Sequence, residues 1–153
     1  MDDAVINVPF GQVRLIAESD FLSGIEFLLE RHAPKKPVSA LLREVEAQLG
    51  AYFRNPRHQF DLPLTLHGTA FQQRVWKALC DIPPGLPQTY GQLAETLGTA
   101  PRPVGGACGA NPIPVIVPCH RVVAASGLGG FMRTRYRGPL NIKSWLLAHE
   151  RAD

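Results

Sequence analysis

The chain has 153 residues, of which 45% are hydrophobic and 19% charged, a composition typical of one compact globular domain or two small ones. It contains no apolar run of transmembrane length, and its acidic start, Met1-Asp2-Asp3, is unlike a secretory signal. Its three cysteines, an odd number without paired spacing, disfavour a disulfide framework. We therefore expect a cytoplasmic protein whose thiols stay reduced.

The net charge of +3 is unevenly distributed between the two halves of the chain. Residues 1–70 carry seven Lys or Arg and nine Asp or Glu, a net charge of −2, whereas residues 71–153 carry nine and four, a net charge of +5. A basic half can bind a polyanion, but small basic domains are common. The charge therefore indicates a nucleic-acid partner only where a recognition element accompanies it.

Three short segments in the first half are β-prone or alternate in polarity: residues 5–8, 12–17 and 23–28. The sequences Pro-Phe-Gly at 9–11 and Ser-Asp at 19–20 separate them and favour tight turns. The pattern predicts a small antiparallel sheet.

Apolar residues then recur at helical spacing between residues 38 and 53, with charged residues on the opposite face. Pro37 suits the first turn of this helix, and Asn55-Pro56 suits its end. No cysteine precedes Cys80, which disfavours a thiolate metal site in this half. The first half is therefore interpreted as a scaffold. The apolar positions of the helix are Val38, Leu41, Leu42, Val45, Leu49 and Phe53.

Two capping boxes mark helices in the second half. Thr69 with Gln72 begins a helix that continues to Cys80, and this cysteine is interpreted as a core thiol. Thr89 with Gln92 begins a shorter helix, residues 90–97, which stops at Gly98. A further short segment, residues 102–110, is rich in small residues. Two short helices joined by a Gly-containing turn suggest a helix-turn-helix, although such pairs also occur in many helical domains.

The composition of residues 102–110 limits how such a motif would contact DNA. The segment 104–109 lacks the long side chains that distinguish base edges in a major groove. Small residues instead let the backbone approach a bulky partner, and Arg102 stands at the leading end. If the segment binds DNA, we expect binding that is largely independent of base sequence.

A cysteine between a proline and a histidine, Pro118-Cys119-His120, follows the apolar run at 113–117. Proline fixes the backbone before the sulfur, and a cysteine held beside His120 and Arg121 can be kept partly as the nucleophilic thiolate. The alternative is an inert buried thiol, since free cysteine is among the most buried residue types. The pattern alone leaves both open.

Five motifs in order resemble the O6-alkylguanine-DNA alkyltransferases, also called methylated-DNA–protein-cysteine S-methyltransferases. The resemblance is close over about residues 60–150 and loose in the first half, and five motifs in order are far more specific than any one of them. They are YGQLA at 90–94, RPVGGA at 102–107, NPIP at 111–114, PCHRV at 118–122 and KSWLLAHE at 143–150.

The resemblance implies an α+β fold in two domains. Residues 1–66 would form an N-terminal scaffold domain of a small antiparallel sheet plus a helix. Residues 67–153 would form a mostly helical domain that contains the helix-turn-helix and the active-site cysteine. The family moves an alkyl group from O6 of guanine onto its own cysteine. Because the thioether product has no easy leaving route, the protein is consumed after one turnover, and O4-alkylthymine is a possible second substrate.

By the same resemblance, Cys119 is the acceptor of the alkyl group. His120 takes the thiol proton through a bridging water, and Glu150 orients the imidazole. Asn111 is the hinge residue between the recognition helix and the segment that carries Cys119. The resemblance implies no cofactor and no metal.

The resemblance also implies double-stranded DNA as partner, bound by a monomer that flips the damaged nucleotide out of the stack. Tyr90 would crowd the target phosphate and Arg102 would fill the vacated place, whereas from the residues alone a core aromatic and a solvated surface charge remain the alternatives. The remaining assignments are Gly105, Gly106 and Ala107 to the DNA-binding helix, and Tyr90, Val122, Tyr136 and Arg137 to the pocket for the base.

The stretch after the thiol departs from the family pattern. It is a few residues longer and carries Arg133, Arg135 and Arg137, which either bind phosphate or obstruct the pocket. In one alignment Arg137 replaces a small pocket residue; in the other Phe131 takes the aromatic position and residues 133–137 are an insertion.

Two alternatives to alkyl transfer remain. One is a protein that binds alkylguanine lesions with weak or no transfer, because of the atypical Arg-rich loop at 131–139. Another is a cytosolic thiol enzyme that acts on small molecules, which Arg102 and the helix-turn-helix disfavour. Pro103 and Gly109 also leave the recognition helix with less side-chain bulk, which puts the efficiency of alkyl transfer in question rather than the fold.

Overall fold

A computed structural model of the chain describes residues 2–132 and 137–151, without the side chain of Arg137. The chain divides into two compact units, residues 1–67 and 68–153, and each is described by itself. None of the helices in the described ranges combines the length and the hydropathy that a membrane span needs.

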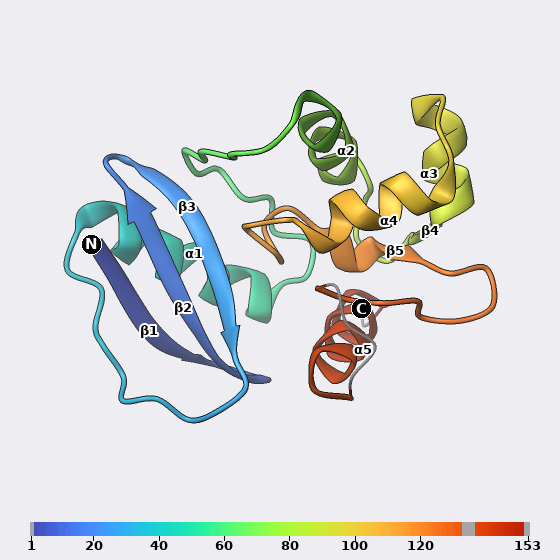
Figure 1. The fold of residues 1–153 in the computed structure, drawn as a ribbon. Helices are drawn as coiled ribbons and strands as arrows, with labels where there is room; N and C mark the ends of the chain where they lie inside the picture. The colour runs from blue at the N-terminus through green and yellow to red at the C-terminus, as the bar shows by residue number, and fades with distance from the viewer. Residues whose placement is uncertain (1, 133–136, 152–153) are drawn as a thin grey trace. The chain divides into compact units, whose positions relative to one another are not determined.

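The first unit contains the predicted three-stranded antiparallel sheet, in the order β1-β2-β3 (Figure 1). Tight turns at Pro9-Phe10 and at Ser19-Asp20 connect the strands, and Ser19 adopts a φ of 55°. The strands extend beyond the predicted segments because pairing continues to the chain start, where Asp2 lies opposite Ala17. Their bounds are β1, Asp2–Val8; β2, Gly11–Glu18; and β3, Phe21–Leu28.

Helix α1, Ala40–Arg54, packs its buried residues against this sheet. It begins later than the sequence predicts, because the Ser39 side chain accepts a hydrogen bond from the Leu42 amide at 3.2 Å and caps the helix there. Pro37 therefore precedes the helix, and Val38, which was predicted on its apolar face, is 71% exposed. The predicted end at Asn55 is confirmed. The buried residues of α1 are Leu42, Val45, Leu49 and Tyr52.

The second unit is mostly helical, as predicted, and the two units together form an α+β fold. Two short strands in it pair in parallel, Gln88 with Val122 and Thr89 with Val123. This pairing joins the start of α3 to the segment that follows Cys119 (Figure 1). The elements are α2, Ala70–Cys80; β4, Gln88–Thr89; α3, Tyr90–Leu97; α4, Pro101–Gly109; the 3-10 turn η1, Cys119–Arg121; β5, Val122–Val123; and α5, Arg137–Arg151.

Both predicted capping boxes form, and α3 ends at Gly98 in the left-handed conformation with a φ of 68°. Helices α3 and α4 follow one another across this turn as a helix-turn-helix. The prediction of Cys80 as a core thiol is wrong: Cys80 is exposed, because it follows Leu79 at the end of α2 and lies off the apolar face.

A buried hydrogen bond fixes the packing of α4 on α2. The indole Nε1 of Trp76, a side chain that is 1% exposed, donates to the carbonyl of Ala107 at 2.8 Å. A buried hydrogen bond of this kind specifies position as well as contributing stability. It therefore holds α4, which lines the cavity described below.

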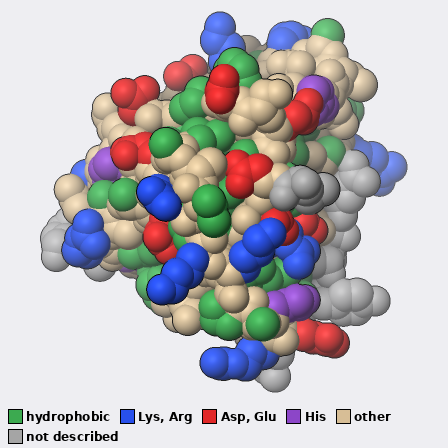
Figure 2. Space-filling model, turned by 90° about the vertical axis from the view of Figure 1, so that its left-hand side faces the viewer, with side chains coloured by type: hydrophobic (Ala, Val, Ile, Leu, Met, Phe, Trp, Pro, Cys, Tyr) green, Lys and Arg blue, Asp and Glu red, His purple; other side chains and the backbone are tan. Residues whose placement is uncertain are grey.

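On the face shown in Figure 2, Lys and Arg side chains are interspersed with Asp and Glu side chains. Among the described side chains on this face, neither sign of charge is gathered into a field of the kind that attracts a polyanion.

Candidate active site

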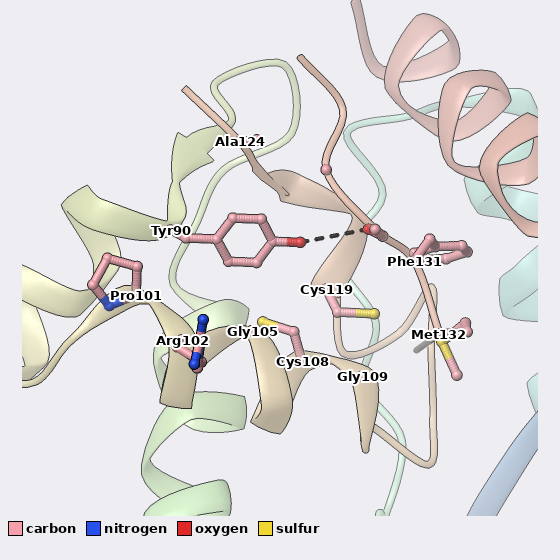
Figure 3. Close-up of a pocket in the computed structure, with 12 residues that line it drawn as sticks. Tyr90, Pro101, Arg102, Gly105, Cys108, Gly109, Cys119, Ala124, Phe131 and Met132 are labelled. Atoms are coloured by element: carbon pink, nitrogen blue, oxygen red, sulfur yellow. Dashed lines mark hydrogen bonds between the residues drawn. The ribbon is translucent and has the colours of Figure 1, made fainter. Parts of the chain in front are cut away.

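A cavity of about 430 Å³ opens in the second unit beside Cys119 (Figure 3). The ring of Tyr90, from the first position of α3, reaches across it toward Gly130, and Arg102 and Met132 lie toward opposite ends. Its lining residues are Tyr90, Pro101, Arg102, Gly105, Cys108, Gly109, Cys119, Ala124, Gly129, Gly130, Phe131 and Met132.

The backbone before Cys119 is a pair of tight turns rather than a strand. The amide of Val117 donates to the carbonyl of Ile113 at 2.9 Å, and Val115 between them adopts a φ of 75°, a left-handed conformation that is rare for a β-branched residue. Pro118 then forms an inverse γ-turn, with φ −83° and ψ 66°, in which the Cys119 amide donates to the Val117 carbonyl at 2.8 Å. These turns place the thiol at the start of η1.

Asn111 holds these turns from the end of α4. Its Nδ2 donates to the Val117 carbonyl at 2.7 Å, and its Oδ1 accepts from the Ile113 amide at 3.0 Å. The side chain is 2% exposed, so both bonds are shielded from water. The Val117 carbonyl thus accepts from both Asn111 and Cys119.

Burial raises the pKa of the Cys119 thiol to about 11, although hydrogen bonding with Asn111 and the charge of Lys143 act to lower it. The side chain is 3% exposed, and desolvation disfavours the thiolate. At neutral pH the thiol is therefore protonated. Of the two alternatives that the sequence left open, burial therefore favours the protonated thiol in the resting protein, and transfer from it needs a base.

That base is available next to the thiol. The Nε2 of His120 lies 2.7 Å from Oε2 of Glu150, and both side chains are fully buried. Arg121 donates to both carboxylate oxygens, from Nε at 2.9 Å and from Nη2 at 3.0 Å, so Glu150 is held as an ionised acceptor. His120 therefore donates from Nε2 and carries its lone pair on Nδ1.

Two observations indicate that this lone pair is free to accept a proton. Burial lowers the pKa of His120, which outweighs the opposing effect of Glu150, so the imidazole is neutral at neutral pH. Its Nδ1 is buried and has no hydrogen-bond partner among the described residues. A buried, unpaired acceptor is costly in a folded protein and is expected mainly where function requires it.

Lys143 is a second buried charge near the thiol. Its Nζ donates to the carbonyls of Val122, Leu128 and Gly130 at 2.8, 2.6 and 2.8 Å, and lies 5.7 Å from the ring centre of Tyr90. Burial lowers its pKa to about 8. This side chain therefore fastens the loop that forms one wall of the cavity.

Sequence reasoning assigned no role to Lys143, and it placed Arg121 beside the thiol and not against Glu150. The signal available for Lys143 was its spacing: Lys143, Leu146, Leu147 and Glu150 share one face of α5, and a lysine on an apolar face needs partners. No comparable signal in the sequence pairs Arg121 with Glu150, which is 29 residues away.

The loop opposite Tyr90 approaches its ring closely. The Tyr90 hydroxyl donates to the Gly130 carbonyl at 3.4 Å, the bond drawn in Figure 3. Gly129 adopts a φ of 74°, and a Cβ atom added there would lie 2.9 Å from Cε2 of Tyr90 and 3.2 Å from the amide nitrogen of Ala124. A side chain at this position would therefore push either the ring or the loop.

We expect Gly129→Ala to lower the free energy of unfolding by about 1–3 kcal/mol, because alanine is strained at a left-handed φ and meets the Tyr90 ring. Denaturant titration measures this loss. Gly127→Ala, in the same loop with open space around its Cβ, is the control and should cost much less. Equal losses for the two variants would contradict the close packing of Gly129.

The residues predicted to contact DNA occupy different environments. Arg102 is exposed in the first turn of α4 and lines the cavity. Gly106 is exposed with open space above it, and Gly105 faces the Tyr90 ring at 3.9 Å from an added Cβ. Ala107, in contrast, is 3% exposed, so its side chain belongs to the core and not to the exposed face of α4.

The predicted pocket residues are placed only in part. Tyr90 lines the cavity, whereas Val122 is fully buried in β5 and is not among the described lining residues. Tyr136 lies outside the described residues, and so do Arg133, Arg135 and the side chain of Arg137. Phe131 lines the cavity, in the place that the second alignment gives to an aromatic residue. Sequence reasoning missed Cys108 and Ala124, for which it offered no signal beyond small size.

Comparison with known proteins places this geometry in a family. The family model described as "6-O-methylguanine DNA methyltransferase, DNA binding domain" matches residues 70–152. The chain is 40% identical over 153 residues to the methylated-DNA–protein-cysteine methyltransferase of Mycobacterium bovis, covering 96% of this chain and 90% of that protein. It is 38% identical over 154 residues to the protein of the same name from Methanosarcina acetivorans, covering 96% of each.

Solved structures agree with the sequence comparisons. The crystal structure of Mycobacterium tuberculosis OGT in complex with DNA superposes with a TM-score of 0.82 at 39% identity, over 96% of this chain and 91% of that one. An O6-methylguanine DNA methyltransferase from Methanococcus jannaschii superposes with a TM-score of 0.66 at 28% identity, over 97% and 93%. With a buried thiol, a histidine-carboxylate pair behind it and relatives that match nearly the whole chain, this protein belongs to the family of methylated-DNA–protein-cysteine methyltransferases, which act in direct-reversal DNA repair.

Proposed function

We propose that the protein accepts a methyl or larger alkyl group from O6-alkylguanine in double-stranded DNA onto Cys119, and does so once. The observation that carries the proposal is the position of the Cys119 thiol, which lines the cavity while His120 stands beside it with an unpaired Nδ1. The same protein can take the alkyl group from O4-alkylthymine if that base fits the cavity.

Cys119 needs deprotonation because burial holds its pKa at about 11. The Nδ1 of neutral His120 accepts this proton through a bridging water, and Glu150 fixes the tautomer by accepting from Nε2. Arg121 keeps the carboxylate ionised and in place through its two hydrogen bonds. Asn111 positions the thiol by holding the preceding turns.

The transfer is a displacement at carbon. The Cys119 sulfur bonds to the alkyl carbon as the bond from that carbon to O6 breaks. The guanine leaves as an anion and takes up one proton, equal to the one that Cys119 released, so that an unmodified base results. The sulfur ends as a thioether, which is uncharged and a poor leaving group. No group in the described cavity would reverse this bond, so each molecule reacts once and is a reagent as much as an enzyme.

The nucleotide must leave the duplex to reach this cavity, at a cost of a few kcal/mol, roughly. Tyr90 at the start of α3 crowds the target phosphate, and Arg102 on α4 fills the place that the base vacates. Gly105 and Gly106 let the backbone of α4 come close to the duplex. Because these residues have no long side chains that could distinguish base edges, the protein binds duplexes as a monomer and largely without regard to base sequence. Three free thiols suit a reducing cytoplasm.

A duplex that contains a single O6-methylguanine tests the proposal by mass spectrometry of the intact protein. The wild type should gain the mass of one methyl group in place of one hydrogen, and Cys119→Ala should gain none. Cys80→Ala is the matched control, because Cys80 is exposed and outside the described cavity lining, and it should react like the wild type. An unmodified wild type after long incubation would refute the proposal.

The lesion-binding alternative is not favoured. Its basis was the Arg-rich segment, which lies largely outside the described residues. The thiol that transfer requires lines the cavity, and His120, the next residue in the chain, is hydrogen-bonded to Glu150. The relatives from Mycobacterium bovis and Methanosarcina acetivorans, at 40% and 38% identity, are both named methyltransferases.

A further inference from the structure

A second thiol, Cys108, lines the same cavity as the acceptor and has no part in the function proposed above. It projects from α4, is 6% exposed, and is a free thiol like Cys119. In Figure 3 the side chains of Cys108 and Cys119 both lie below the Tyr90 ring as drawn. The cavity therefore holds two sulfur nucleophiles around the place where an alkyl group would be transferred.

The two thiols are close enough to affect each other electrostatically. Burial raises the pKa of Cys108 to about 12, and a negative charge on Cys119 adds to this effect, while the charge of Lys143 opposes it. Alkylation turns Cys119 into an uncharged thioether. Cys108 is then the remaining thiol among the described lining residues, and the charge of Lys143 still acts to lower its pKa.

We propose that Cys108 captures alkyl groups that carry a second leaving group, so that the protein converts an O6-(2-haloethyl)guanine lesion into an internal ethylene bridge between Cys119 and Cys108. The inference rests on the proposed function, because Cys119 must first take the haloethyl group. It extends that function to a class of lesion whose first product is itself an alkylating agent.

The chemistry balances in three steps. Cys119 loses its proton and bonds to the first carbon of the 2-chloroethyl group, and guanine departs. The new thioether sulfur then displaces chloride from the neighbouring carbon and forms a three-membered episulfonium ring. The Cys108 sulfur opens this ring and releases its proton to water, so that one S–C bond replaces another. Chloride and this proton are the other products of the last two steps.

The fold favours Cys108 over competing nucleophiles. Helix α4 is fastened to α2 by the bond from Trp76 to the Ala107 carbonyl, next to Cys108, so this thiol is held beside the cavity and does not have to diffuse to it. Once guanine departs, the alkylated Cys119 and the Cys108 thiol both line the emptied cavity. Among the other described lining residues, the Met132 thioether would give a charged sulfonium, and the Tyr90 hydroxyl is a weaker nucleophile than sulfur.

Titration of thiols in denaturant tests the bridge directly. The untreated protein has three titratable cysteines, a methylated one should retain two, and a bridged one should retain only one. The probe is a duplex treated with a chloroethylating nitrosourea immediately before mixing. The expected mass gain is that of an ethylene group less two hydrogen atoms, in protein that carries no covalently attached DNA.

Cys108→Ser provides the matched variant, and only its alkylated fraction is compared, so that a slower first step does not matter. This fraction should lose the bridge and carry a chloroethyl or hydroxyethyl group instead, whereas Cys80→Ser should still form the bridge. Two remaining thiols in alkylated wild type, or a protein–DNA crosslink as the main product, would overturn the inference. Because the thiols are counted in the wild type, this test does not depend on the folding of any variant.

A parallel reaction with the O6-methylguanine duplex separates the two proposals. If the protein accepts a methyl group from the methyl duplex but forms no bridge with the chloroethyl duplex, only the role of Cys108 is refuted. Failure of methyl transfer refutes the proposed function and the bridge with it.

Discussion

Replacing Glu150 by alanine is expected to lower the free energy of unfolding by about 3–5 kcal/mol, because it removes one partner of a buried ion pair. Glu150 is fully buried and accepts hydrogen bonds from His120 and from two nitrogens of Arg121. Without the carboxylate, the Arg121 guanidinium keeps only its bond to the Ile82 carbonyl among the bonds described here. Its charge then lies largely buried without a counterion.

The same change is expected to slow alkyl transfer by at least about a hundredfold, which is the contribution of a positioned general base. Glu150 fixes the His120 tautomer that leaves Nδ1 free, and a His120 that rotates or takes the other tautomer does not accept the Cys119 proton. Glu150→Gln tests the orientation of His120 in a protein that keeps its packing. The glutamine amide preserves the side-chain volume but cannot accept hydrogen bonds from all three donors.

Quenched single-turnover reactions and denaturant unfolding measure these losses. Glu46→Ala, an exposed glutamate of α1, is the control, and it should unfold and react like the wild type within error. Transfer at the wild-type rate by folded Glu150→Gln would show that the carboxylate does not orient the base.

Much of the fold was predictable because its signals are local. The capping boxes at Thr69 and Thr89 and the stop at Gly98 depend on residues within one helical turn, and all three formed where the sequence places them. The start of α1 was misjudged because two local signals compete, Pro37 in a first turn and Ser39 as a cap, and the cap hydrogen bond decides.

The pairing of Gln88–Thr89 with Val122–Val123 was not predictable, because two-residue strands have no pattern of their own. This pairing nevertheless brings Tyr90 to the loop after Cys119. Motifs could therefore name the thiol and the residues near it in sequence, whereas the cavity depends on contacts between segments far apart in the chain.

The ionisation of the site shows the same limit. A cysteine beside a histidine and an arginine suggests a lowered pKa, but Arg121 faces Glu150, and the imidazole is neutral. Burial then dominates and raises the pKa of Cys119. The sign of the shift follows from where each charged group points, which sequence neighbours do not determine.

Lys143→Met is expected to lower the free energy of unfolding by on the order of 3 kcal/mol, because three carbonyls lose their buried donor. Methionine fills a similar volume, so the loss reflects the hydrogen bonds and not a cavity. The wall of the cavity at Gly130 is released with them, and the Cys119 pKa rises further, since the charge of Lys143 lowers it. Alkyl transfer should therefore slow as well.

The pH dependence of this loss distinguishes a buried lysine from a merely well-packed one. Between about pH 8, the folded pKa, and pH 10.5, the ordinary value, the unfolded chain binds a proton at Lys143 that the folded protein does not. The contribution of Lys143 to the free energy of unfolding of the wild type therefore increases as pH rises through that window. The variant lacks this titration but shares the thiols and His120, so the difference in unfolding free energy between wild type and Lys143→Met should grow from pH 8 to 10.5. Lys77→Met, on the exposed side of α2, is the control for removing a lysine that is not buried and should change the free energy of unfolding far less. A constant difference for Lys143→Met would mean that the ammonium keeps its ordinary pKa and is reached by water, and the cavity wall would then be held by packing alone.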